Sequence, residues 1–228
     1  MSAIDELSKL PPPQPPAMSP ALEAELAQLA PVATRRPLRQ LALLVGVSLI
    51  YGAGLFAMLF ALRADLHDLP MGWLFGVGLA WLLGFLVPIT LATVPARGSM
   101  MPRWRLAGLA SVVAAIAMIG LGLVVHPGTI VMSGWDGVVH GYGCLEAGLG
   151  VAIVPIVLGT IALRRTVPVG SRWVAAGLGA GGGSLGGLVL HLHCPIANGL
   201  HVGLIHGGVI VVAAVLAAAI APRVTEVR

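Results

Sequence analysis

The sequence predicts an all-α membrane protein, a polytopic bundle of six transmembrane helices with a short cytosolic N-terminal segment. Of the 228 residues, 57% are hydrophobic and only 10% are charged, a balance that excludes an ordinary soluble domain. Several apolar runs approach or exceed about 20 residues, the length that a helix needs to cross roughly 30 Å of hydrocarbon. These runs are rich in Gly and Ala and do not alternate apolar with polar residues, so they predict helices and not barrel strands.

The apolar runs also predict the organisation of the chain. Residues 1–40 form a cytosolic, proline-rich segment, 41–221 the transmembrane domain and 222–228 a cytosolic tail. We expect the spans at about 41–62, 71–93, 106–125, 143–163, 173–192 and 199–221. Within the fifth span, Gly179, Gly183 and Gly187 recur at every fourth position, which predicts a seam where another helix approaches closely.

The arginines predict the orientation in the membrane. With a cytoplasmic N-terminus, Arg63 is the only one of the 13 lysines and arginines that falls in an external loop. This positive-inside bias predicts that both termini lie in the cytoplasm, and in a bacterium such a protein belongs to the inner membrane. The basic residues then lie beside anionic membrane lipid, so the isoelectric point near 9.8 reports topology and does not indicate direct nucleic-acid binding.

The N-terminal segment contains one short amphipathic helix. Ser19-Pro20 is typical of a helix start, and Pro31 ends the segment. An apolar stripe with an acidic flank follows the start, made of Leu22, Leu26, Leu29, Glu23 and Glu25. A helix this short is not stable alone in water, so the stripe predicts a partner-binding surface. The alternative is a disordered tether whose periodicity arises by chance.

Side chains that bind metals or react with oxidants gather between residues 140 and 206. Both cysteines and five of the seven histidines lie there, and the predicted topology brings them to the external end of the bundle. Thiolate and imidazole are the ligands that zinc prefers, and disulfides persist in an oxidising compartment. We therefore predict either a zinc-like metal ion or a Cys144–Cys194 disulfide, with possible metal ligands at His140, His191, His193 and His201. The alternative is that these histidines are merely satisfied by hydrogen bonds at the membrane interface and bind no metal. No base and orienting group accompany either cysteine, so we predict no catalytic residue and no enzyme.

The order of these features resembles the NrsF-type polytopic anti-sigma factors. The shared features are the short cytosolic N-terminus, six spans, a cysteine near the fourth span, the Leu192-His193-Cys194-Pro195 motif and a final span ending in Ala-Pro-Arg. The resemblance covers residues 1–223. It implies that the cytosolic segment sequesters an extracytoplasmic-function sigma factor, and that Cys144 and Cys194 sense metals or oxidants.

Two other classes remain open from the sequence. A small metal-handling or transport protein would line a pathway with the same histidines and cysteines, yet only His206 lies well inside a predicted span. A haem-binding membrane subunit would need paired axial histidines on facing helices.

Overall fold

The computed structural model describes residues 19–28, 36–59, 61–95, 100–124, 127–163 and 171–225, and the regular structure in them is helical. The chain divides into two units, Met1–Arg35 and Arg36–Arg228, which are described separately. In the first unit, α2 spans Pro20–Gln28. The Ser19 hydroxyl accepts a hydrogen bond from the Leu22 amide at 3.3 Å, which confirms the predicted start of this helix.

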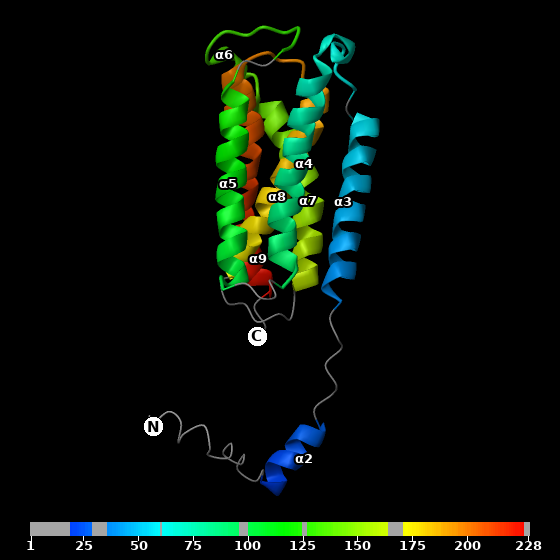
Figure 1. Ribbon diagram of the computed structural model, residues 1–228, viewed down its shortest axis with the longest axis vertical. Coiled ribbons are helices and arrows are strands. Elements are labelled where there is room, and N and C mark those ends of the chain that lie inside the picture. Colours follow the sequence, from blue (N-terminus) through cyan, green and yellow to red (C-terminus); the bar gives the residue numbers. More distant parts are fainter. Residues whose placement is uncertain are drawn as a thin grey trace, which may run out of the picture. The chain divides into compact units, whose positions relative to one another are not determined.

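The second unit is a bundle whose six long helices are apolar enough to cross a membrane (Figure 1). They are α3 (Pro37–Leu59), α4 (Met71–Thr93), α5 (Arg103–Leu123), α7 (Tyr142–Leu163), α8 (Ser171–His193) and a final helix in which η2 (His201–His206) continues into α9 (Gly207–Thr225). Two short helices, η1 (Leu66–Asp68) and α6 (Asp136–Val139), lie in the connecting loops. The predicted fold class is therefore confirmed.

The helices extend past the apolar runs at one end. α3 begins at Pro37 and α5 at Arg103, three or four residues before the expected starts at 41 and 106, while α9 continues to Thr225. Arginine has a long apolar stem that can lie along a helix while its charged group reaches water, so the first turns tolerate it. Arg39 thus lies in the first turn of α3.

Successive helices alternate in direction, so the loops form two groups. We call the end that holds residues 61–70, 127–141 and 194–198 the cysteine end, and the end where α3, α5 and α8 begin the arginine end.

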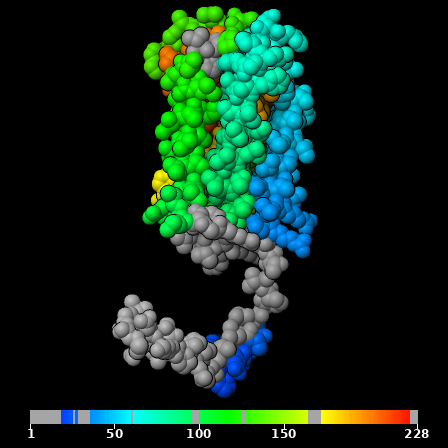
Figure 2. Space-filling model, in the orientation of Figure 1, coloured from blue at the N-terminus to red at the C-terminus, as the bar shows by residue number. Residues whose placement is uncertain are grey.

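α8 is the central helix of the bundle. In its 18-residue apolar stretch 89% of the residues are buried, against 17% in the corresponding stretch of α3. On the face shown in Figure 2, α4 and α5 cover α8 almost completely. Glycine allows this enclosure, because a Cβ at Gly183 would lie 2.6 Å from the backbone Cα of Ile210 on α9. The predicted seam is divided between two neighbours: Gly179 and Gly183 face the α9 backbone, whereas Gly187 faces the Trp81 ring of α4.

The predicted partner-binding stripe is described only in part. The side chains of Leu22, Glu23 and Glu25 are exposed on α2, and 45% of the Leu22 surface is accessible. The Leu26 side chain and the whole of Leu29 lie outside the described residues.

Candidate functional site

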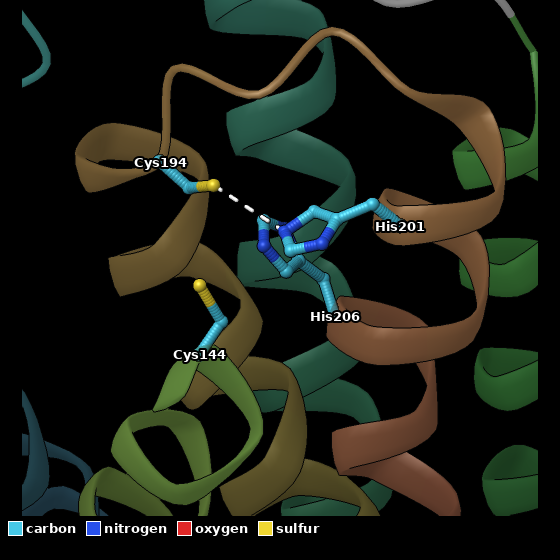
Figure 3. A group of neighbouring side chains, drawn as sticks. All are labelled: Cys144, Cys194, His201 and His206. Carbon is cyan, nitrogen blue, oxygen red and sulfur yellow. Dashed lines mark hydrogen bonds between the residues drawn. The ribbon is translucent and has the colours of Figure 1, made fainter. Parts of the chain in front are cut away.

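Four side chains from three parts of the bundle converge near the cysteine end (Figure 3). They are Cys144 in the first turn of α7, Cys194 directly after α8, and His201 and His206 of η2. One ligand-forming atom of each lies within 4.8 Å of those of the other three. His201 and His206 are almost fully buried, as is Cys194, while Cys144 is half-buried. We call these four residues the Cys/His cluster.

The His201 ring is oriented by a backbone carbonyl. Its Nδ1 lies 2.7 Å from the Gly137 oxygen, and because a carbonyl only accepts, Nδ1 must carry a hydrogen. The other nitrogen, Nε2, lies 3.4 Å from the Cys194 sulfur. A single proton between Nε2 and Sγ makes this contact favourable, whichever atom holds it.

The Cys194 thiol is more acidic than an ordinary cysteine. Hydrogen bonding from the Cys144 thiol is the largest cause that holds the pKa of the Cys194 thiol well below its ordinary value. The nearby imidazoles of His201 and His206 act in the same direction, and burial opposes them. Thiolate is the form of cysteine that binds metals and reacts with oxidants, so Cys194 is prepared for either chemistry. Both cysteines are free, and no disulfide joins them in this structure.

His206, the fourth residue of the cluster, has a ring nitrogen without a hydrogen bond in the described part of the chain. Its side chain is 2% exposed, and its Nε2 is buried without a hydrogen-bond partner among the described residues. Its ring packs edge-on against His201, with the ring centroids 4.9 Å apart. Buried polar atoms are nearly always paired, so an unpaired one next to two thiols and an imidazole indicates a ligand site.

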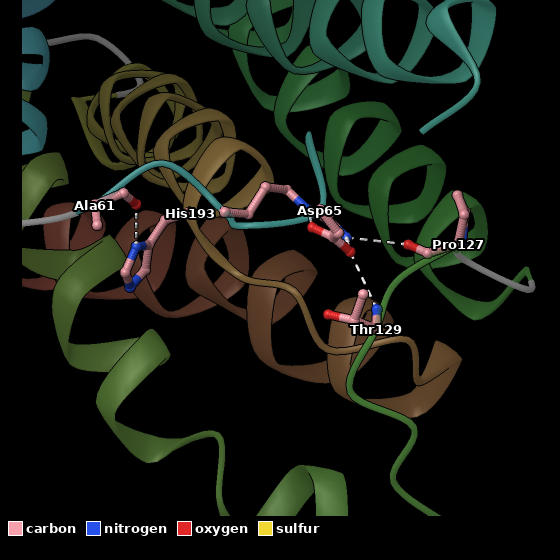
Figure 4. Close-up of polar contacts among 6 residues, drawn as sticks. Ala61, Asp65, Pro127, Thr129 and His193 are labelled. Carbon is pink, nitrogen blue, oxygen red and sulfur yellow. Dashed lines mark hydrogen bonds and ion pairs between the residues drawn. The ribbon is translucent and has the colours of Figure 1, made fainter. Parts of the chain in front are cut away.

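Three of the histidines predicted as possible ligands lie outside the Cys/His cluster. His140 is exposed, and its Nδ1 donates to the backbone oxygen of Asp136 at 2.7 Å. It lies away from Cys144 because α7 begins only at Tyr142, so the two residues do not share a face of that helix. The His191 Nε2 donates to the Leu74 oxygen at 3.0 Å. The His193 Nδ1 donates to the Ala61 oxygen at 2.7 Å (Figure 4). Of the four predicted histidines, the structure brings only His201 to the two cysteines.

Sequence analysis did not place His206 in the site, and the reason is the helical repeat. Five residues separate His206 from His201, and in an α-helix that spacing puts two side chains about 140° apart. The segment His201–His206 is instead a π-helix, whose wider turn brings positions five apart to one face. The one available signal was that His206 is a histidine inside an otherwise apolar span.

Asn198 attaches the loop between α5 and α7 to the cluster. Its Nδ2 donates to the Met132 oxygen at 2.8 Å and the Gly134 oxygen at 3.2 Å, and its Oδ1 accepts from the His201 amide at 3.1 Å. The loop that contributes the Gly137 carbonyl is thereby held to the start of the final helix. The orientation of His201 depends on both contacts.

A buried ion pair closes the same end of the bundle (Figure 4). The Arg63 Nε and Nη2 donate to the two Asp65 oxygens at 2.6 and 2.8 Å, and both side chains are at most 5% exposed. Nη2 also donates to the Pro127 oxygen, and Asp65 accepts from the Thr129 amide, so the pair joins the α3–α4 loop to the loop after α5. The lone arginine of the predicted external loops is therefore neutralised by a partner of its own.

A small pocket lies between the ion pair and the cluster. Its volume is about 10 Å³, close to the space that one water molecule needs, and its lining includes Arg63, Trp73, Cys194 and His206. A small ion or water is the largest species that this space accommodates beside the sulfur of Cys194.

The family model of NrsF, described as negative regulator of sigma F, matches residues 26–226. The matched range contains the six candidate spans and the whole Cys/His cluster. No curated protein and no solved structure matches the chain.

Proposed function

The chain belongs to the NrsF family of negative regulators of sigma F, and from this membership we propose that it is an inner-membrane anti-sigma factor. It sequesters a sigma factor of the extracytoplasmic-function type at the membrane and releases it on a stress signal. The match over residues 26–226 is the observation that carries the proposal, and the six apolar helices support the membrane location. The protein acts by binding a partner, not by catalysis, and it does not contact DNA directly.

The arginine distribution supports an orientation with the arginine end in the cytoplasm and the cysteine end in the periplasm. An impermeant thiol reagent added to whole cells should then label Asp136→Cys, because Asp136 is exposed at the cysteine end. Labelling of Arg103→Cys and not of Asp136→Cys would invert this orientation.

α2 is the proposed contact with the sigma factor. Leu22 is exposed on a nine-residue helix, and the acidic Glu23 and Glu25 stand beside it. An apolar anchor flanked by carboxylates suits a hydrophobic groove with a basic rim on the partner. Anionic lipid repels the same charges, which keeps the helix available for a soluble partner.

Truncation of the apolar stripe should weaken sigma-factor binding. We expect Leu22→Ala combined with Leu26→Ala to cost about 2–4 kcal/mol of binding free energy, because buried leucine anchors dominate helix-in-groove contacts. The measurement is the affinity of the full-length protein, in lipid nanodiscs, for each extracytoplasmic-function sigma factor of the source bacterium. Gln28→Ala, an exposed change in the last turn of the same helix, is the matched control. Unchanged affinity of the double variant for a confirmed partner would move the contact to the arginine end.

The Cys/His cluster is the proposed entry point of the signal, which is a metal ion or an oxidant. The cluster joins α7, the end of α8 and the start of the final helix, so a change there can shift three helices as rigid bodies. Such a shift changes sigma-factor binding only if the ligand or oxidant favours one of two bundle arrangements.

Serine at either cysteine should abolish release and leave repression intact. We expect Cys144→Ser, Cys194→Ser and the double variant to behave alike, because each removes one of the two sulfurs that the response needs. The measurement is a reporter driven by the sigma factor, with and without divalent metal or oxidant stress. His140→Gln, outside the cluster, should respond as the wild type does. Normal induction in both single variants would show that the signal enters elsewhere.

A further inference from the structure

The π-helical turn at the start of the final helix brings two histidine side chains to one side of that helix. It places His201 and His206, five residues apart, with their rings 4.9 Å from each other, an arrangement that a regular α-helix does not allow. π-helical turns are rare and concentrate at functional sites. The turn directs two imidazoles to the side of the helix where Cys144 and Cys194 lie (Figure 3).

In each of the two rings, Nε2 is placed where it can bind a ligand. His201 donates Nδ1–H to the Gly137 carbonyl, which is the outer contact that orients metal-binding histidines and leaves Nε2 to coordinate. His206 Nε2 is buried and has no hydrogen-bond partner among the residues that the structure describes. One nitrogen is thus aimed at the Cys194 sulfur, and the other is a buried nitrogen without a hydrogen bond to the described residues.

The spacing of the four donor atoms agrees with tetrahedral coordination. Bonds of about 2.3 Å to sulfur and about 2.0–2.1 Å to nitrogen place neighbouring S and N ligands about 3.6 Å apart around zinc. The Cys194 sulfur and His201 Nε2 are 3.4 Å apart, and no pair in the cluster exceeds 4.8 Å. A shell of this size needs side-chain adjustments and no rearrangement of helices.

We propose that Cys144, Cys194, His201 and His206 bind one divalent ion of the zinc class in a closed, four-coordinate site. Two thiolates and two imidazoles select zinc and chemically similar soft or borderline ions over magnesium and calcium, which prefer oxygen ligands. Binding displaces two protons, the one between Cys194 and His201 and the thiol proton of Cys144, so a divalent ion enters with balanced charge. Arg63 lines the adjacent pocket, but Asp65 neutralises it, so it does not exclude a cation.

The inference rests on the proposed function in one respect, that metal binding is the signal, yet the binding itself is independent of any sigma factor. The ion also favours the π-helical form of residues 201–206, because only that form presents both histidines. It therefore has different affinities for two forms of the final helix, which is the condition for shifting a conformational equilibrium.

The test is a titration of the purified, reduced, metal-free full-length protein with Co²⁺ as a spectroscopic probe. We expect one Co²⁺ per chain, with the intense visible bands of tetrahedral coordination, a near-ultraviolet band from thiolate ligation, and displacement of both by Zn²⁺. His206→Gln and Cys144→Ser should each weaken binding at least about tenfold, since each removes a ligand. His191→Gln, a buried histidine outside the cluster, should bind as the wild type does.

Absence of the tetrahedral bands in the wild type, or equal binding by His206→Gln, would overturn the proposal. If a variant does not fold, X-ray absorption at the zinc edge of the wild-type protein decides, because the proposal requires two sulfur and two nitrogen neighbours. Sigma-factor binding by the metal-free protein is measured separately. If that binding persists without any Co²⁺ site, only this inference fails; if Co²⁺ binds and no sigma factor does, only the proposed function fails.

Discussion

Asp65→Asn is expected to lower the free energy of unfolding by about 3–5 kcal/mol, the usual result of removing one partner from a buried ion pair. Asp65 accepts two hydrogen bonds from Arg63 and one from the Thr129 amide, and both charged side chains are almost completely buried. Asparagine keeps the shape but leaves the guanidinium without a counter-charge. The measurement is equilibrium unfolding of the full-length protein in mixed micelles.

Asp68→Asn is the matched control, because Asp68 lies in the same loop and is exposed. Its stability should stay within about 0.5 kcal/mol of the wild type, as for most surface substitutions. Equal losses in the two variants would show that the ion pair does not hold the cysteine end together.

Acidification provides a second check on this pair. Hydrogen bonds from Arg63 are the largest cause that lowers the pKa of the Asp65 carboxyl. Because this pKa is lowered, the ionised Asp65 carboxyl makes its full contribution to the free energy of unfolding above the unfolded-state pKa, about 3.9. That contribution is lost as the pH falls through the lower folded-state pKa. The stability difference between the wild type and Asp65→Asn should therefore be constant at neutral pH and shrink below about pH 4.

Alanine at both Gly179 and Gly183 is expected to destabilise the bundle by about 2–6 kcal/mol, since overpacking typically costs about 1–3 kcal/mol per site. A Cβ at Gly183 would lie 2.6 Å from the Ile210 Cα, and one at Gly179 would meet the backbone of Ala213 and Ala214. Backbone atoms cannot rotate away as a side chain can, so α8 and α9 must separate. The cluster joins these helices, so the double variant should also bind Co²⁺ more weakly.

Gly46→Ala and Gly150→Ala are the controls, because a Cβ at either helical position meets nothing within 4 Å. Alanine is the better helix former by up to about 1 kcal/mol, so these variants should be as stable as the wild type or slightly more stable. A double variant at Gly179 and Gly183 with wild-type stability would contradict the close packing of α8 against α9.

Local features of the chain were sufficient to predict the bundle. An apolar run long enough to span a membrane specifies a helix without reference to the other runs, and alternation of direction then brings both cysteines to one end. The start of α2 was also predictable, because Ser19 and Pro20 act on the adjacent amides. Those conclusions depend on interactions between residues that are close in sequence, so the order of the residues is enough to predict them.

Which side chains form the cluster was decided by the tertiary structure. His140 was expected on the face of Cys144, but α7 begins two residues after it, and His191 and His193 donate to the carbonyls of Leu74 and Ala61 instead. His206 enters through a π-helical turn that the 3.6-residue periodicity of an α-helix does not predict. The contacts of the Arg63–Asp65 pair with Pro127 and Thr129 likewise depend on how two loops pack against each other. Sequence alone determined which groups reach the cysteine end, because span length and direction are local properties. Their partners there depend on through-space packing and on one departure from the regular helical repeat, and only the folded bundle contains that information.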